Sequence, residues 1–204
     1  MLNRHFFSLF LLFVFLALPL TTSAAISSSG SVFSLEGVGT TSLPTGCSAT
    51  AAVGTESMTN METQYDLSAT DTAGIHYARL LVYKAPQDLG MAGTLIDLIG
   101  FKPEIYPLLS EMGKTLVSKK LEENNLKLIE WLPANKSSIP NHPGIQLALR
   151  ATLPEKLPLP MFAIVNLVPR NGQITAVVLI CPDIDKNYWQ PIYLQMLGSL
   201  KENS

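Results

Sequence analysis

The sequence contains little charge and no large excess of either sign. Of its 204 residues, 15% are Asp, Glu, Lys or Arg, and the formal net charge is −2. A protein that grips a nucleic acid backbone needs a basic surface, so this balance argues against nucleic acid as a partner. The hydrophobic share of 47% excludes a disordered chain, and the length is typical of one domain with its own core.

Only one long apolar run is present, and it stands at the N-terminus. A run of 15 residues, 6–20, follows Arg4 and precedes the small residues of 21–25. These three parts match a cleavable secretory signal peptide covering residues 1–25. Cleavage after Ala25 removes one basic residue and no acid, which leaves residues 26–204 with a net charge of −3. An uncleaved anchor is the alternative, although a bilayer core needs about 20 apolar residues.

We therefore expect residues 26–204 to form a single soluble α+β domain, with residues 26–30 as a flexible lead-in. No later segment reaches about 18 apolar residues without a charge or a proline, so no membrane span is expected after signal removal. A signal peptide without a lipidated cysteine suits export to a bacterial periplasm or secretion into the medium. The sequence leaves both locations open.

Cysteine is scarce, with only Cys47 and Cys181, which are 134 positions apart. Neither a Cys-x-x-Cys motif nor a Cys/His ligand spacing is present, so we expect no metal site of the zinc type and no cofactor. Two interpretations of the pair stay open. In an exported protein an even pair suggests a disulfide, which across so long a loop would contribute about 5 kcal/mol at most. Two separate buried thiols are the alternative.

The sequence also has few groups for acid–base or nucleophilic catalysis. After the signal peptide only His76 and His142 remain, and the Gly-x-Ser-x-Gly nucleophile motif is absent. His142 stands in a turn-like segment beside a proline and a glycine, whereas His76 stands in an expected strand. We therefore expect no catalytic residue, and we expect the protein not to be an enzyme.

A segment near the C-terminus matches the start of a calcium-binding loop but not its later positions. Residues 183–187 carry Asp, Asp and Asn at alternate positions, as such a loop begins. The loop requires Gly at its sixth position and Glu at its twelfth, where this sequence has Tyr188 and Leu194. We therefore expect no calcium site, and we expect Asp185 to cap the N-terminus of the last helix.

Four charged or titratable residues in expected strands are candidates for ligand binding: Arg79, Arg150, Glu130 and His76. An arginine in a half-buried strand either forms an ion pair, with Glu130 as a possible mate, or holds an anionic ligand. In the second case the four side chains converge on one cleft. Asn166, which interrupts an apolar strand, would then mark the same face.

Apolar periodicity predicts the elements of the N-terminal half. Residues 31–35 form a short strand, and the Gly-, Ser- and Thr-rich segment 36–73 forms small exposed edge strands and turns. Residues 75–83 form a longer strand, and Pro86 opens a helix that runs to Ile99. Pro103 opens a second helix. Its expected buried face consists of Ile105, Leu108, Leu109, Met112, Leu116 and Val117.

The C-terminal half is predicted to contain four strands and a helix. The strands cover 126–131, 145–153, 161–168 and 173–181, with a loop at 133–144 and an irregular proline-rich segment at 154–160. Asn171-Gly172 predicts a hairpin between the last two strands. Both of these strands are apolar on both faces, so both faces of their sheet must be covered. One cover is the apolar stripe of the last helix, formed by Trp189, Ile192, Tyr193, Met196, Leu197 and Leu200.

Three segments resemble the PsbP-like family: Val32-Phe33-Ser34-Leu35, the strand 127–131, and Trp189 through Leu200. This family includes the extrinsic P subunit of photosystem II, a Ran-GTPase-binding nuclear transport factor and exported bacterial proteins of unknown role. The resemblance implies an α+β fold with a single antiparallel β-sheet and helices packed on both faces, an α/β/α sandwich. It also implies a binding or assembly protein without catalytic residues, and no functional motif of the family carries over to a residue here.

Two hypotheses for the function follow. The first is an exported, soluble, non-catalytic binding or assembly protein, whose partner is another envelope or secreted protein. The alternative is a binder of a small anionic ligand, or a hydrolase, that uses Arg79, Arg150, Glu130 and His76. The alternative requires these four side chains to converge on one pocket.

Overall fold

The computed structural model describes residues 32–35, 38–51, 62–84, 102–123, 125–140, 144–153, 157–170 and 173–201. The expected signal peptide and lead-in lie outside the described residues. So do the helix expected between Pro86 and Ile99, the turn residues Asn171-Gly172, and His142.

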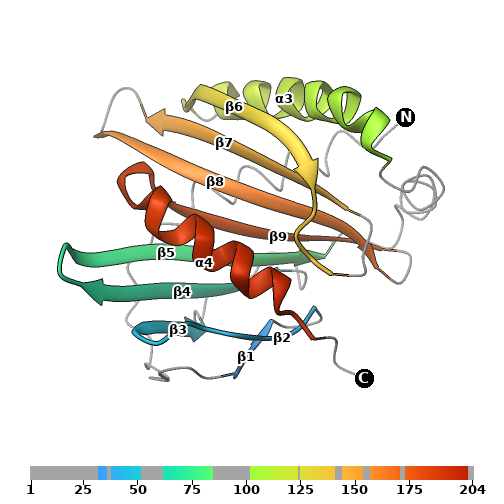
Figure 1. Cartoon of the computed structure of the whole chain (residues 1–204). Coiled ribbons are helices and arrows are strands. Elements are labelled where there is room, and N and C mark those ends of the chain that lie inside the picture. Colours follow the sequence, from blue (N-terminus) through green and yellow to red (C-terminus); the bar gives the residue numbers. More distant parts are fainter. Residues whose placement is uncertain are drawn as a thin grey trace.

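The described residues contain a seven-stranded antiparallel sheet with the strand order β3-β4-β5-β9-β8-β7-β6 (Figure 1). In chain order its strands are β3 (Cys47–Ala51), β4 (Glu62–Asp71), β5 (Gly74–Lys84), β6 (Lys127–Lys136), β7 (Ile145–Leu153), β8 (Leu157–Arg170) and β9 (Gln173–Pro182). The helix α3 (Tyr106–Glu123) follows a short 3-10 turn, Pro103–Ile105. The helix α4 (Lys186–Gly198) follows a second one, Asp183–Asp185. The fold class is therefore α+β with a large antiparallel sheet.

The prediction of a single sheet is wrong, because β1 (Val32–Leu35) and β2 (Gly39–Ser42) pair with each other in a separate two-stranded sheet. The backbone hydrogen bonds of β2 explain the separation. Thr40 exchanges two of them with Lys201, at 2.8 Å each, so β2 is joined to the segment after α4.

The central hairpin of the sheet is confirmed. β8 and β9 pair from Met161↔Pro182 to Arg170↔Gln173, which brackets the two-residue turn. Their apolar side chains are buried throughout the middle of both strands, with Ile164 and the consecutive residues Val177 and Val178 fully inaccessible to solvent. Since successive strand residues point to opposite faces, this burial extends to both faces of the hairpin.

The buried residues divide into two clusters that follow this alternation. The α4-side cluster contains Leu80 of β5 together with Trp189 and Tyr193 of α4. The α3-side cluster contains the next residue of β5, Leu81, together with Val117 of α3. In Figure 1, α4 crosses in front of the sheet and α3 runs along β6.

The predicted buried face of α3 is confirmed at Val117 and wrong at Leu108 and Met112. Leu108 and Met112 are 63% and 45% exposed. Besides Val117, the buried residues of α3 are Ser110, Gly113 and Leu121. The bulk of Trp131 on β6 explains the rotation, because its indole N–H donates to the Ser110 hydroxyl at 2.8 Å and its ring lies against Gly113. A large ring on the sheet side leaves room only for small residues on the helix side.

The strands are longer than predicted in three places. β4 runs over ten residues, and Tyr65, Leu67 and Ala69 are buried, so this segment is an internal strand between β3 and β5. β6 continues to Lys136, into the expected loop. β8 begins at Leu157, inside the segment expected to be irregular. Pairing with β9 starts only at Met161, so the first residues of β8 have one strand neighbour and tolerate proline.

The disulfide interpretation of the two cysteines is wrong, since both Cys47 and Cys181 are free and buried. The sheet order explains this. β4 and β5 lie between β3, which carries Cys47, and β9, which carries Cys181. Three strand spacings amount to about 14 Å, whereas a disulfide needs Cα atoms within about 7 Å. Burial raises the pKa of the Cys181 thiol to about 12 and also raises that of Cys47.

Candidate functional site

The four candidate ligand-binding residues do not share one face of the sheet. On β5, His76 lies on the same face as Leu80, in the α4-side cluster, whereas Arg79 lies on the face of Leu81. Arg79 donates from Nε to Asp66 Oδ1 of β4 at 2.9 Å. The hypothesis that Arg79 converges with His76 on one ligand is therefore wrong.

Arg150 is the centre of an ion-pair group that joins three elements. Its Nε and Nη2 donate to the two carboxylate oxygens of Asp183, at 2.8 and 2.5 Å. Its Nη1 donates to Glu130 of the neighbouring strand β6, at 3.2 Å. These two carboxylates raise the pKa of Arg150, with Asp183 the larger cause. The predicted pairing with Glu130 is confirmed, and the bidentate bond to Asp183 is added to it.

His76 stands between two carboxylates that come from different elements. Its Nδ1 is 2.8 Å from Asp185 Oδ1, in the turn before α4, and its Nε2 is 3.1 Å from Asp71 Oδ1, at the end of β4. The first contact is a hydrogen bond, whereas the second has ion-pair distance without hydrogen-bond alignment. Asp185 and then Asp71 raise the pKa of His76, and His76 lowers that of Asp71.

The His76 ring is also held by an aromatic contact. It stacks on Tyr188 of α4 with ring centroids 4.1 Å apart and an interplanar angle of 9°. Tyr188 in turn meets Trp189 edge-on, at 5.3 Å and 82°. Its hydroxyl lies 4.0 Å from the Cys47 sulfur. Burial, followed by the neighbouring Cys47, raises the pKa of Tyr188 to about 12, so the phenol keeps its proton at neutral pH.

The expected N-cap role of Asp185 is wrong. Asp185 does occupy the position before α4, but its side chain makes no capping hydrogen bond, and its φ and ψ are −93° and 1°. A capping residue has extended backbone angles that turn its side chain toward the helix N–H groups. Here the preceding 3-10 turn sets different angles, and the carboxylate bonds to His76 instead.

Asn166 lies on the α4 side of β8, but it does not mark a ligand site. It is fully buried, its Nδ2 donates to the Tyr193 hydroxyl at 3.0 Å, and its Oδ1 accepts from the Ser138 N–H at 3.1 Å. Tyr193 donates onward to the Val177 carbonyl at 2.7 Å. These bonds tie Ser138 and α4 to the middle of the sheet.

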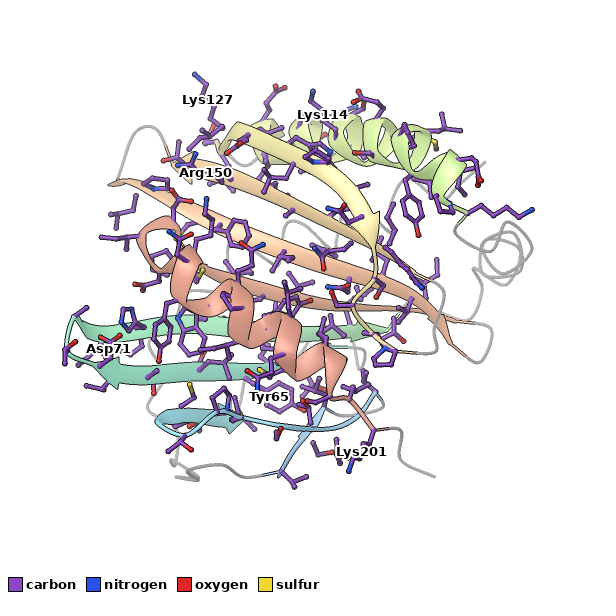
Figure 2. The ribbon with its side chains drawn as sticks, viewed as in Figure 1. Tyr65, Asp71, Lys114, Lys127, Arg150 and Lys201 are labelled. Atoms are coloured by element: carbon purple, nitrogen blue, oxygen red, sulfur yellow. The ribbon has the colours of Figure 1, made fainter. Side chains whose placement is uncertain are left out.

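Together these contacts form one polar group at the start of α4, which we call the α4 anchor: Asp71, His76, Glu130, Arg150, Asp183, Asp185 and Tyr188. Figure 2 shows Arg150 and Asp71 toward the same end of the sheet, on either side of the start of α4. Among the described residues, no three or more His, Cys, Asp or Glu are placed to hold a metal ion. None of the helices in that part of the chain is long and apolar enough to cross a bilayer.

The sequence does not indicate the roles of the three aspartates of the anchor, Asp71, Asp183 and Asp185. Asp71 has a local indicator, because its Oδ1 accepts from the N–H groups of Ala73 and Gly74 at 2.7 and 3.2 Å, as in an Asp-x-x-Gly turn. Asp183 and Asp185 were recognised as a helix lead-in. Their partners Arg150 and His76 are 33 and 109 positions away, so only the strand order reveals the pairs.

No protein-family model and no curated protein matches the chain. Several solved structures do. PA94, a protein of unknown function from Pseudomonas aeruginosa, has a TM-score of 0.46 and 12% identity, covering 87% of this chain and 99% of that one. The cyanobacterial PsbP of Synechocystis sp. PCC 6803 has a TM-score of 0.47 and 12% identity, covering 91% and 99%. The Ran-binding protein Mog1p of Saccharomyces cerevisiae has a TM-score of 0.45 and 12% identity, covering 85% and 93%.

The solved structures thus include a PsbP protein and a Ran-binding protein, the two kinds of protein named with the sequence resemblance.

Proposed function

We propose that this chain is an exported, non-catalytic protein that binds another protein of the cell envelope or the medium. The observation that supports this is the internal neutralisation of Arg150 and His76. Each is held by two carboxylates of this same chain, Arg150 by Asp183 and Glu130, and His76 by Asp185 and Asp71. A cation that holds an anionic ligand, or a base that takes a proton from a substrate, needs a side free for that group.

These ion pairs serve the fold. They attach the start of α4 to β5, β6 and β7, and so they fix one cover of the sheet. The proposal therefore includes the α/β/α sandwich arrangement, with α3 and α4 packed on opposite faces. Its support is the division of the buried residues into an α3-side and an α4-side cluster. Export is part of the same proposal, and its support is the three-part pattern of residues 1–25.

Photo-crosslinking in the cells that make the protein tests the proposed binding. A photoreactive amino acid is placed, one position at a time, at the exposed large apolar residues Val32, Ile75, Tyr77, Leu108, Met112, Ile129, Leu159 and Ile184. We expect one protein to be crosslinked reproducibly from a subset of neighbouring positions, on a chain that begins at Ile26. The purified partner should then bind the unmodified chain with a measurable Kd. Uniform background labelling from all positions would contradict the proposal.

A thermal-shift series tests the competing ligand hypothesis. A ligand that binds the folded state raises the melting temperature by mass action. Because Asp183 and Glu130 already occupy Arg150, we expect millimolar phosphate, sulfate or citrate to raise the melting temperature no more than sodium chloride of equal ionic strength. The matched control is Arg150→Met. An anion-specific rise in the wild type that this variant abolishes would show a ligand site at Arg150 and overturn the proposed role of the anchor.

A further inference from the structure

We propose that His76 is a proton-operated clamp, which holds the start of α4 on the sheet when its ring is protonated and loosens that attachment when the ring is neutral. The proposal goes beyond the binding function and stands independently of it. It would make the packing of α4 depend on pH across the range near neutrality.

The number of hydrogen-bond donors on the His76 ring depends on its protonation. Carboxylate oxygens lie 2.8 Å from Nδ1 and 3.1 Å from Nε2. An imidazolium carries an N–H on both nitrogens, whereas a neutral imidazole carries one N–H and one lone pair. Only the protonated ring can therefore donate a charge-assisted hydrogen bond to Asp185 and at the same time present a positive charge to Asp71, whose contact with Nε2 has ion-pair distance without hydrogen-bond alignment. In the neutral ring one carboxylate faces a lone pair, and the remaining hydrogen bond loses the charge assistance that makes such bonds short and strong.

The three groups belong to separate parts of the fold, so the clamp has a mechanical consequence. Asp71 is fixed in the β4–β5 turn by two backbone N–H groups. His76 is fixed on β5. Asp185 belongs to the 3-10 turn that leads into α4, and its side chain gives that helix no cap. Weakening the His76–Asp185 bond therefore loosens the attachment of the start of α4 to β5.

The other groups around the ring do not reverse this effect. Tyr188 stacks on the ring from α4, and an aromatic face favours a cation over a neutral partner. Cys47 of β3 lies beyond Tyr188, at 4.0 Å from its hydroxyl, and both of these pKa values are raised. The remaining charges of the turn are directed elsewhere, Asp183 to Arg150 and Lys186 over the Phe162 ring.

The sign of the pH effect follows from the direction of the shift. The pKa of His76 is raised in the folded protein, first by Asp185 and then by Asp71. A raised folded pKa contributes stability that is complete below the unfolded value of about 6.5 and is lost as the pH rises through the folded pKa. The clamp is therefore closed below about pH 6.5 and loosens as the pH rises through the raised pKa of the folded protein.

Amide hydrogen exchange on the full mature chain tests the proposal. The readout is the protection factor of Gln190, Ile192 and Tyr193, whose N–H groups belong to the first hydrogen-bonded turns of α4. Protection factors remove the intrinsic pH dependence of exchange. We expect these three to fall as the pH rises from mildly acidic to mildly alkaline, by about tenfold for each unit separating the folded and unfolded pKa values. An NMR titration of the His76 ring should give a pKa above about 6.5.

Two variants separate the clamp from a merely structural contact. His76→Gln should give protection factors that no longer change with pH. Asp183→Asn removes a carboxylate two positions from Asp185 and weakens a bond to an arginine that does not titrate, so it should lower protection equally at both pH values. A wild-type ring pKa at or below the ordinary value overturns the proposal. So do wild-type protection factors that do not change with pH, and both readings need only the wild-type chain.

Discussion

Replacement of Trp189 by alanine should lower the free energy of unfolding by about 3–5 kcal/mol, the range for deletion of a large aromatic side chain from a core. Trp189 is fully inaccessible to solvent and belongs to the α4-side cluster. Its ring meets Tyr188 edge-on, and Tyr188 supports the His76 ring. The substitution therefore opens a cavity under α4. It also removes the aromatic contact that holds Tyr188 against the His76 ring. Urea unfolding followed by far-UV circular dichroism measures the change.

Trp189→Phe is the matched control, because it keeps an aromatic ring in place. The indole N–H of Trp189 is buried, and within the described part of the chain it has no hydrogen-bond partner. Its loss therefore forfeits no hydrogen bond, and because a phenyl ring leaves a smaller cavity than a methyl group does, we expect a clearly smaller cost than for the alanine variant. A cost for the alanine variant as small as that of the phenylalanine variant would mean that Trp189 does not carry the packing of α4.

Gly144→Ala should destabilise the protein by about 1–3 kcal/mol through overpacking. A Cβ at this position would lie 2.6 Å from the Leu167 carbonyl oxygen, 2.6 Å from Val168 Cγ1 and 2.8 Å from Ser137 Cβ. The carbonyl belongs to β8, whose pairing with β7 and β9 leaves it little freedom to move. The midpoint of thermal or urea unfolding reports the loss.

The same substitution at Gly198 gives the opposite expectation. A Cβ there meets nothing within 4 Å, and the position is helical. Alanine should therefore stabilise α4, by about 1 kcal/mol at most, through its higher helix propensity. If Gly144→Ala proved as harmless as Gly198→Ala, the close approach of Gly144 to β8 would be contradicted.

The parts of the fold that the sequence predicts are those in which one residue pattern decides the outcome. The strand expected at 145–153 has the bounds of β7. The hairpin expected around Asn-Gly is formed by β8 and β9, which pair as far as Arg170 and Gln173. The stripe of the last helix is buried at Trp189, Tyr193, Met196 and Leu197. In each case local chemistry and tertiary packing favour the same structure.

The parts that the sequence does not predict are those in which a distant residue overrides the local pattern. Leu108 and Met112 follow helical periodicity, yet Trp131 on another element turns the helix so that Ser110 and Gly113 face the sheet. In the same way β4 looks like an exposed edge until β3 is known to pair with it. Composition alone does not contain these contacts.

The candidate site shows the same division. The cross-strand pair Arg150–Glu130 could be predicted because both residues lie in strands that follow one another in sequence. Whether Arg79 shares a face with His76 depends only on the alternation within β5, and their odd separation of three positions places them on opposite faces. The partners supplied by the 3-10 turn could not be predicted, because nothing local shows where that turn docks.

The seam between β5 and β9 has a consequence for how the chain reaches its native state. Strands β3 to β5 pair in sequence, and so do β6 to β9, whereas the seam joins residues about a hundred positions apart, such as Arg79 and Ile180. Contacts of such long range form slowly, because the intervening chain must lose entropy before the pairing repays it. During synthesis, strands β3 to β5 are therefore made long before β9. The edge of β5 stays unpaired until nearly the whole chain has been made. We expect the joining of the two halves to limit the folding rate.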